Sequence, residues 1–206
     1  MRTRPSAKED IPQLKALWKQ AFGDEDSFID AFFEDLYRPE RCVLIEDEGR
    51  VLSMAYLLPC TLVWKGEGGS SEGLLESADC AYLYGMCTDE AYRGRGLGLM
   101  LLSFAKGYMG AMGCEAIALL PADEGLFGFY RKAGYELFFE PMARFDAQCW
   151  LSYPSAFIDF QKKMDLMYGE DHFSKSPLEV SGYKAMLRRL SGRIPDVKGY
   201  MAIALE

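Results

Sequence analysis

The pattern of hydrophobic and polar positions along the first part of the chain predicts two helices followed by a hairpin. Apolar residues recur with a helical period over residues 11–22, and Gly23 is typical of a helix end. A second helix is expected after Asp24, whose side chain can cap it. The apolar face of this helix contains Phe28, Phe32, Phe33 and Leu36. Residues 41–47 and 51–59 then predict two strands joined by the turn "EDEGR".

The middle of the chain continues with alternating strands and helices. Strands are expected at residues 81–88, 115–120 and 135–139, and helices from Leu97 onward and over residues 123–132. The helix from Leu97 is apolar over most of its surface, so we expect it to be well buried. The expected order is strand, two helices, three strands, helix, strand, helix and strand. Such an order indicates a mixed α/β layer.

The last part of the chain has a less regular pattern. Pro154 is suited to a first helical turn, the apolar positions of residues 183–190 suggest another helix, and residues 200–205 form a final apolar strand. Because these segments carry apolar faces, we expect them to pack on the main body. The sequence therefore predicts a main domain over residues 1–140 and a small α/β extension over residues 141–206.

The composition is that of a soluble globular protein with an acidic balance. Half of the 206 residues are hydrophobic, and the formal net charge is −8. A nucleic-acid-binding domain usually carries a basic face, so this balance argues against a nucleic-acid partner. The N-terminus has no apolar signal core, and no run reaches the ~18 apolar residues of a membrane span. We therefore expect a cytoplasmic protein with no membrane contact.

The cysteine pattern argues against a metal site. The six cysteines form no C-x-x-C pair, and His172 is the only histidine. His172 lies in a polar segment, where a solvated side chain is expected. The cysteines are expected to be scattered core thiols in a reducing compartment, and no bound metal is expected.

The segment "YRGRGLGLMLL", residues 92–102, places three glycines at alternate positions at the start of the long helix. Glycines let backbone N–H groups approach a ligand closely, and the first N–H groups of a helix lack intrahelical partners. The helix dipole favours an anion there, and a nearby arginine adds charged hydrogen bonds. The segment therefore predicts a turn that binds a phosphorylated ligand.

Two common nucleotide-binding motifs do not fit this turn. A P-loop requires G-x-x-x-x-G-K-[ST], and the turn contains no lysine followed by Ser or Thr. The dinucleotide motif G-x-G-x-x-G fails because the third glycine is missing: Leu99 stands in its place when the motif starts at Gly94, and Leu101 when it starts at Gly96. The turn also follows two helices and three strands, whereas the dinucleotide motif opens a βαβ unit.

A third pattern, [QR]-x-x-G-x-[GA], is satisfied by Arg93, Gly96 and Gly98. With its flanks "GMCTDEAYRGRGLGLMLL" and "LLPADEGLFGFYRKAGYE", the chain resembles the GNAT N-acetyltransferase superfamily over most of residues 1–140. The closest resemblance is to bacterial members of the enhanced-intracellular-survival type, which carry a longer C-terminal portion. The resemblance implies a GNAT acyl-CoA N-acyltransferase fold, an α/β fold with a mixed sheet, here with a shortened extension.

The resemblance also implies acetyl-CoA as the cofactor and suggests where it binds. Backbone N–H groups from Gly94 to Gly98 would hold the pyrophosphate, with Arg93 or Arg95 paired to it. The preceding strand would pair with the pantetheine arm beside a bulge, for which Gly85 is well placed. The implied cofactor-binding residues are Met86, Cys87, Thr88, Arg93, Gly94, Arg95, Gly96, Leu97 and Gly98.

The resemblance implies two catalytic residues. Tyr130 stands where the family often has a catalytic tyrosine and would protonate the departing thiolate, while the alternative is that it only packs in the core. Tyr82 and Tyr84 occupy the region where many members have a basic glutamate. The base is then either an ordered water or the terminal carboxylate of Glu206, by analogy with the survival-type members.

The expected function is transfer of the acetyl group of acetyl-CoA to a primary amine by direct attack in a ternary complex. Cys87 has no partner base in its strand, so a covalent acetyl-enzyme is not expected. The alternative is a non-catalytic acyl-CoA-binding or regulatory module that keeps the fold. The acceptor is a small-molecule or peptide amine that the sequence does not identify, and a homo-oligomer is possible.

Overall fold

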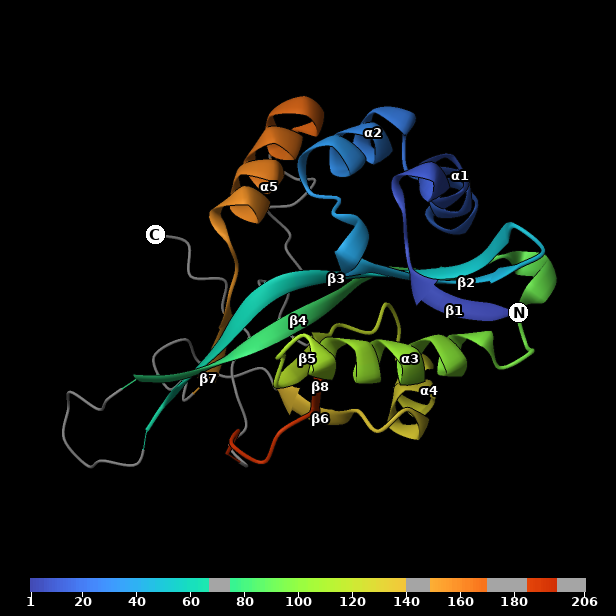
Figure 1. Ribbon diagram of the computed structural model, residues 1–206. Coiled ribbons are helices and arrows are strands. Elements are labelled where there is room, and N and C mark those ends of the chain that lie inside the picture. The colour runs from blue at the N-terminus through green and yellow to red at the C-terminus, as the bar shows by residue number, and fades with distance from the viewer. Residues whose placement is uncertain (67–74, 140–148, 170–184, 196–206) are drawn as a thin grey trace.

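A twisted, mixed β-sheet with helices on both faces forms the body of the protein (Figure 1). The computed structural model describes residues 1–66, 75–139, 149–169 and 185–195. Helices α1, α2 and α5 cover one face of the sheet, and α3 and α4 cover the other. The helices are α1 (Ile11–Phe22), α2 (Asp26–Asp35), α3 (Leu97–Ala111), α4 (Leu126–Lys132) and α5 (Ser155–Tyr168).

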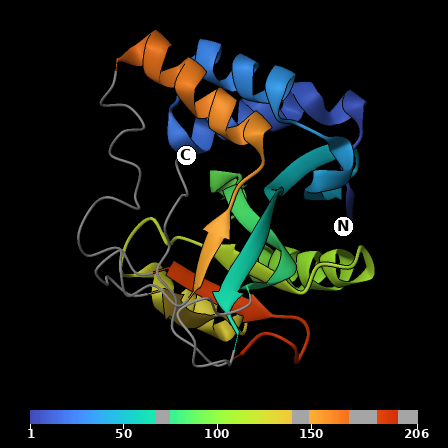
Figure 2. The same ribbon diagram turned by 90° about the vertical axis from the view of Figure 1, so that its left-hand side faces the viewer.

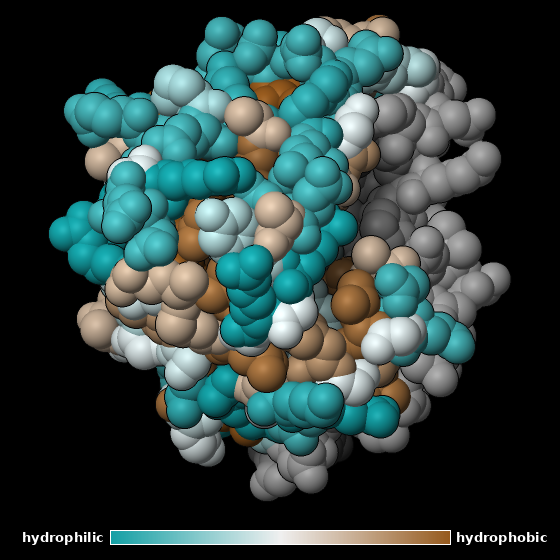
Figure 3. Space-filling view, turned by 90° about the vertical axis from the view of Figure 1, so that its right-hand side faces the viewer, coloured by the Kyte–Doolittle hydropathy of each residue, from teal (hydrophilic) through white to brown (hydrophobic). Residues whose placement is uncertain are grey.

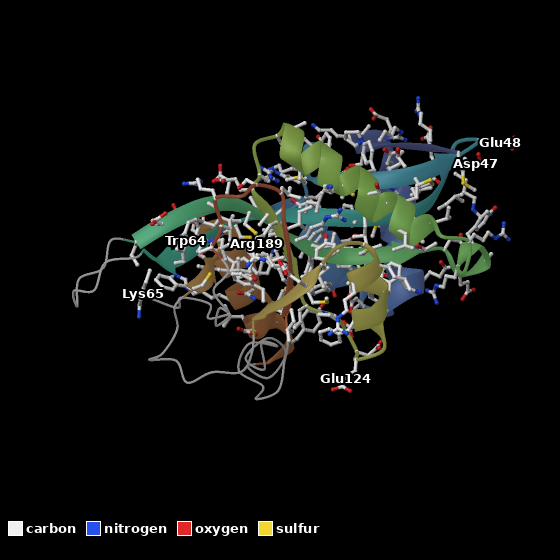
Figure 4. The ribbon with its side chains drawn as sticks, turned by 90° about the horizontal axis from the view of Figure 1, so that it is seen from below. Asp47, Glu48, Trp64, Lys65, Glu124 and Arg189 are labelled. Carbon is white, nitrogen blue, oxygen red and sulfur yellow. The ribbon has the colours of Figure 1, made fainter. Side chains whose placement is uncertain are left out.

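The described strands form one sheet in the order β1-β2-β3-β4-β5-β8-β6, with β7 paired to β3. Only β4 and β5 run parallel among these pairs; the others are antiparallel. The strands are β1 (Arg2–Pro5), β2 (Cys42–Asp47), β3 (Arg50–Lys65), β4 (Leu75–Thr88), β5 (Ala116–Leu119), β6 (Glu136–Phe139), β7 (Cys149–Ser152) and β8 (Ala185–Arg189). The long β3 runs from the hairpin at Asp47 and Glu48 to Lys65 at the opposite end of the sheet (Figure 4).

The two faces of the sheet bury different kinds of side chain. The core under α1, α2 and α5 is rich in aromatic rings. Trp18 lies among the rings of Phe22, Phe28, Phe32, Phe33 and Tyr84. The core under α3 and α4 is largely aliphatic, with Leu101, Leu102 and Ala105 fully buried in it. The aromatic core therefore marks the face toward which Tyr84 of β4 points.

The mixed α/β architecture agrees with the sequence-based expectation. Helix α1 ends at Gly23, which adopts a φ of +74° as a left-handed C-cap. The start of the second helix differs from the expectation, because α2 begins at Asp26 with Glu25 as its N-cap. Asp24 therefore does not cap α2 and is free for another interaction.

The helix expected over residues 183–190 is wrong, since residues 185–189 form strand β8. β8 lies between β5 and β6, and its side chains enter the cores on both faces of the sheet. Ala185, Met186 and Leu187 are all buried as a result. A strand buried on both faces is a continuous apolar run without the period-two alternation of a half-exposed strand. The apolar run at these positions therefore carries no strand signal.

The segment after residue 140 contributes strands to the same sheet as the segment before it. β7 lies beside the second half of β3, pairing Leu151 with Leu62, and leads into α5 (Figure 2). β8 pairs with β5 on one edge and with β6 on the other. The boundary between residues 140 and 141 stays a prediction, and the strand expected at residues 200–205 lies outside the described residues.

Candidate functional site

The site begins where β4 separates from its parallel neighbour β5. The two strands pair from Cys80↔Ala116 to Tyr82↔Ala118, and β5 ends at Leu119. β4 continues to Thr88 while still paired with β3 on its other edge. Among the described strands, none pairs with the β5-side edge of β4 beyond Tyr82. Its backbone N–H and C=O groups are therefore available to an extended ligand.

Gly85 forms a bulge in this open part of β4. Met54 pairs with Cys87 and Tyr56 pairs with Tyr84, so two residues of β4 stand opposite one residue of β3. Gly85 has a φ of +58°, a conformation that residues with a side chain rarely adopt. A Cβ atom there would also lie 2.8 Å from a ring carbon of Trp18. The bulge expected from the sequence is confirmed, and the indole ring packs directly against it.

The glycine-rich turn leads from β4 into the N-terminus of α3. Gly94 and Gly96 have φ values of +76° and +79°, and Gly96 is the N-cap. The Met100 N–H donates to the Gly96 carbonyl at 3.1 Å as the first bond of the helix. The preceding N–H groups of Leu97 and its two successors therefore have no intrahelical acceptor. The positive end of the α3 dipole also lies here, so the turn is suited to an anion.

Gly98 allows three elements to meet at the start of α3. A Cβ atom on Gly98 would lie 2.9 Å from Cζ of Phe129 in α4 and 3.4 Å from Cε of Met86 in β4. The absence of a side chain at Gly98 thus lets α4 approach both α3 and β4. The structure brings Met86, predicted as a cofactor contact, against the predicted phosphate turn.

Three arginines surround the turn at the end of the molecule where the N-terminus and the β2–β3 hairpin lie. Arg93 donates from Nε to the Thr88 carbonyl at 3.1 Å, and Arg95 donates to the Ala91 carbonyl at 3.1 Å. Both arginines are exposed, so their remaining N–H groups face solvent. Figure 3 shows this end of the molecule as a largely hydrophilic surface with smaller hydrophobic patches between the polar residues.

The third arginine, Arg50, was missed by the sequence reasoning. Its guanidinium lies 5.2 Å from the centre of the Tyr92 ring, and that of Arg95 lies 4.9 Å from the same ring. Arg50 also donates to Asp89 at 2.6 Å. Burial alone would raise the pKa of Asp89, but the bonds from Arg50 and a backbone N–H outweigh it and hold that pKa low. The β2–β3 hairpin brings Arg50 here, and no local sequence pattern indicates that contact.

Tyr130 lies in α4, one residue after the ring that meets Gly98. Its ring packs edge-on against Phe129 and Tyr135, with centroids 5.1 Å and 5.8 Å away. Burial, followed by the negative charge of Asp123, raises the pKa of Tyr130 to about 12. Within the described residues its hydroxyl makes no hydrogen bond. Tyr130 therefore keeps its proton at neutral pH and has it free to donate.

The side chain of Cys87 lies on the α1 face of the sheet. Its Sγ points toward the Leu17 carbonyl at 3.9 Å. Burial, with a smaller contribution from Cys42, raises its pKa to about 12, although Arg93 opposes the shift. The carbonyl of Cys87 accepts from the Ser53 hydroxyl at 2.8 Å. The thiol is thus protonated and unreactive.

The other predicted residues divide between described and undescribed parts of the chain. Thr88 is positioned by a 2.8 Å hydrogen bond between its hydroxyl and that of Ser53. Tyr82 and Tyr84 are half-buried on the aromatic face of β4, and burial raises the pKa of both phenols. They are therefore poor bases. Glu206 and His172 lie outside the described residues.

Neither a metal site nor a membrane-spanning helix is found in the described ranges. No group of three or more His, Cys, Asp or Glu side chains there could hold a metal ion. No described helix is long and apolar enough to cross a membrane. All six cysteines are free and buried.

Solved structures of several acetyltransferases are similar to this chain. A GCN5-related N-acetyltransferase from Anabaena variabilis is 22% identical over 67% of this chain and 32% of its own, with a TM-score of 0.56. The GNAT family N-acetyltransferase YhbS from Escherichia coli, solved with CoA, is 18% identical over 98% and 87%, with a TM-score of 0.60. Eis1 from Mycobacterium abscessus is 14% identical over 66% and 32%, with a TM-score of 0.53.

These similarities differ in what they establish. At such identities the solved structures establish the fold, and the chain spans about a third of the length of several of them. No curated protein sequence matches the chain. Residues 2–138, well over half of the chain, match the family model described as an acetyltransferase (GNAT) domain. The chain therefore belongs to the GNAT acetyltransferase family.

Proposed function

We propose that this protein transfers the acetyl group of acetyl-CoA to a primary amine by direct attack in a ternary complex. The observation that carries the proposal is the opening between β4 and β5 beside the glycine turn. From Leu83 to Thr88 this edge of β4 is paired with none of the described strands, and it leads directly to an anion-binding helix start. A ligand with an extended amide-containing arm and a diphosphate matches both features.

The described residues fit acetyl-CoA. The N–H groups from Gly94 to Gly98 would bind the pyrophosphate, and Arg93 and Arg95 would neutralise its charge. Arg50 adds a third cation beside Tyr92. The backbone of Met86, Cys87 and Thr88 would pair with the pantetheine arm, as a strand added to the sheet. The CoA present in the solved E. coli neighbour supports this assignment.

When bound, acetyl-CoA would supply an activated acetyl thioester. A backbone N–H at the bulge, beside Met86, would donate a hydrogen bond to the thioester oxygen as negative charge develops on it. Tyr130 would donate its proton to the sulfur that leaves, since a phenol is protonated at neutral pH and this hydroxyl makes no hydrogen bond within the described residues. The unreactive Cys87 thiol favours direct attack by the amine over an acetylated enzyme.

The phenols of Tyr82 and Tyr84 are protonated and poorly suited to remove the amine proton. The resemblance to the GNAT superfamily instead implies a water or the carboxylate of Glu206 as the base. We propose Glu206 on the analogy stated for the survival-type members. A variant extended at the C-terminus by a few residues tests it, because unchanged turnover would exclude the terminal carboxylate.

The second candidate is an acyl-CoA-binding module without turnover. The two tyrosines at the positions where many members have a glutamate favour it. Thiol release from acetyl-CoA with a panel of amines, measured beside the thermal shift produced by CoA, separates the candidates. Stabilisation with amine-dependent thiol release supports the enzyme, and stabilisation without it supports the module. The absence of any stabilisation by CoA contradicts both.

Three finer assignments complete the proposal. We place the protein near the enhanced-intracellular-survival-type members, supported by the similarity to Eis1 over 66% of the chain. We propose a cytoplasmic location, supported by six buried free cysteines. The acceptor is proposed to be a small-molecule or peptide amine, without nucleic acid or membrane partners and with homo-oligomerisation possible.

A further inference from the structure

We propose that Asp24 binds a second, non-reacting ammonium group of the acceptor, so that the preferred acceptors are diamines and polyamines. The inference rests on the proposed acetyltransferase function and names a substrate class for the same site. Asp24 lies in the short connection between α1 and α2. The sequence predicted a helix cap there, but the structure gives its side chain a different position.

Trp18 holds the Asp24 carboxylate beside the bulge of β4. The indole Nε1–H donates to Oδ2 of Asp24 at 2.7 Å. The opposite edge of the same ring packs against Gly85, where a Cβ atom would lie only 2.8 Å away. Trp18 is almost fully buried, so its ring cannot swing away from either partner. The indole ring therefore lies between the Asp24 carboxylate and the bulge, and it fixes the position of the carboxylate relative to Gly85.

The negative charge of Asp24 is not neutralised by the described part of the protein. No described lysine, arginine or histidine nitrogen lies within ion-pair distance of its carboxylate. The ammonium group of Lys19 binds the backbone carbonyl of Asp24 at 2.8 Å and the side chain of Asp26 at 3.2 Å. Asp24 is also only half-buried, so an external cation can reach it.

Two half-buried tyrosine rings lie beyond the indole that binds this carboxylate. The Tyr84 ring lies 5.8 Å from the Trp18 ring, and the charge of Asp24 adds to burial in raising the pKa of the Tyr84 phenol. The Tyr82 ring follows at 6.4 Å, and both tyrosines are half-buried. Aromatic faces attract ammonium groups, and a carboxylate beside them adds a direct ion pair. The combination favours a cationic amine over a neutral ligand.

The bound ammonium is not the group that is acetylated. A carboxylate stabilises the charged form of an amine and raises its pKa, which makes that amine a poorer nucleophile. The carboxylate is also separated from the bulge by the width of the indole. An acceptor with two amines resolves both points, because Asp24 holds one as ammonium while the other attacks the thioester.

Putrescine and n-butylamine test the proposal, since they share a four-carbon chain and differ by one ammonium group. We expect the wild type to use putrescine roughly tenfold to a hundredfold better in kcat/KM, as for one charged hydrogen bond. Asp24→Asn should abolish this preference, mainly through the KM for putrescine. The asparagine oxygen can still accept from Trp18, so the variant changes the charge and keeps the indole bond. Asp26→Asn is the matched control, because that exposed side chain at the first position of α2 should leave the preference intact.

Binding of the two amines to the CoA-saturated protein, measured by calorimetry, gives a readout that does not need turnover. Tighter binding of putrescine that is lost in Asp24→Asn supports the proposal. Equal affinities in the wild type, or a preference that survives in Asp24→Asn, overturns it. Failure of the acetyltransferase proposal gives a different result. The protein would then bind CoA but release no thiol with any amine, whether or not it bound putrescine more tightly than n-butylamine.

Discussion

Strand β4 has a closed part and an open part, and they are built differently. In the closed part, Cys80–Tyr82, the strand is paired with β3 on one edge and β5 on the other. In the open part, Leu83–Thr88, the strands in the described part of the chain pair only with the β3 edge. The closed part is held by strands from distant segments of the chain. The open part is shaped by single glycines at Gly85 and in the turn that follows.

The difference shows how one strand serves both stability and binding. An unpaired strand edge leaves backbone groups without partners, which is a liability unless a ligand uses them. The closed part fixes the position at which β4 and β5 separate. The open part then presents its free edge, with the Gly85 bulge, to the anion-binding start of α3. Substitutions in the two parts should consequently have separable effects on stability and on activity.

The largest effect is expected from Tyr130→Phe in α4, the helix that packs against the start of α3 through Phe129. Loss of the proton donor should lower kcat roughly 10²–10⁴-fold while leaving the affinity for CoA unchanged. Phenylalanine keeps the ring contacts with Phe129 and Tyr135, so the melting temperature should stay close to that of the wild type. Steady-state kinetics and a CoA titration measure the two quantities. A nearly wild-type kcat would show that Tyr130 only packs in the core.

The next effect is expected from Gly98→Val at the start of α3. The new side chain would occupy the space now filled by Phe129, which would lie 2.9 Å from its Cβ. Moving α4 away should cost about 1–3 kcal/mol of CoA binding, a loss of roughly 5–150-fold in affinity. Gly107→Val is the control, because a Cβ at Gly107 in the same helix meets nothing within 4 Å. Equal CoA affinities for the two variants would contradict the role of this close approach.

The sequence predicted the open part of β4 better than the closed part, for a physical reason. The bulge and the glycine turn depend on local backbone conformation. Gly85 therefore predicts the bulge, and Gly96 predicts the turn, from the residues immediately around them. The closed part depends on β8, whose buried apolar residues carry no strand periodicity. The β2–β3 hairpin brings Arg50 to Asp89 beside the turn. The indole of Trp18 binds Asp24 and positions it near the bulge. Contacts between distant segments leave no local pattern, so the sequence missed them.

A smaller effect, on stability, is expected from Gly85→Ala in the bulge. Alanine would be strained at a φ of +58° and would also press on the Trp18 ring. We expect a loss of about 1–3 kcal/mol in the free energy of unfolding, measured by chemical denaturation.

Gly49→Ala separates the two causes of that loss. Gly49 has a φ of +81°, but a Cβ there meets nothing within 4 Å. Its cost should therefore be the backbone strain alone. The additional loss in Gly85→Ala reports the contact with Trp18, and Gly85→Ala should also weaken the preference for putrescine. Identical losses in the two variants would mean that the indole does not constrain the bulge.

The smallest effect is expected in the closed part, where Glu115 anchors β5 to the residues after β8. Its carboxylate accepts from the Ser191 hydroxyl at 2.8 Å and from Nε of Arg193 at 2.9 Å. These bonds, Arg193 first, lower its pKa to about 2 from an ordinary value of 4.5. The ionised form is thus the one that stabilises the fold. Its stabilisation should be complete above pH 4.5 and disappear as the pH falls through about 2.

Glu115→Gln should therefore lower the melting temperature slightly at neutral pH, and its difference from the wild type should shrink as the pH falls from 4.5 through about 2, where the wild-type carboxyl takes up its proton. Thermal melts of both proteins across this pH range measure the difference. CoA affinity at neutral pH should be unchanged, because Glu115 lies at the closed end of β5. If Glu115→Gln weakened CoA binding as strongly as Gly98→Val, the closed and open parts of β4 would not have separable effects on stability and on cofactor binding.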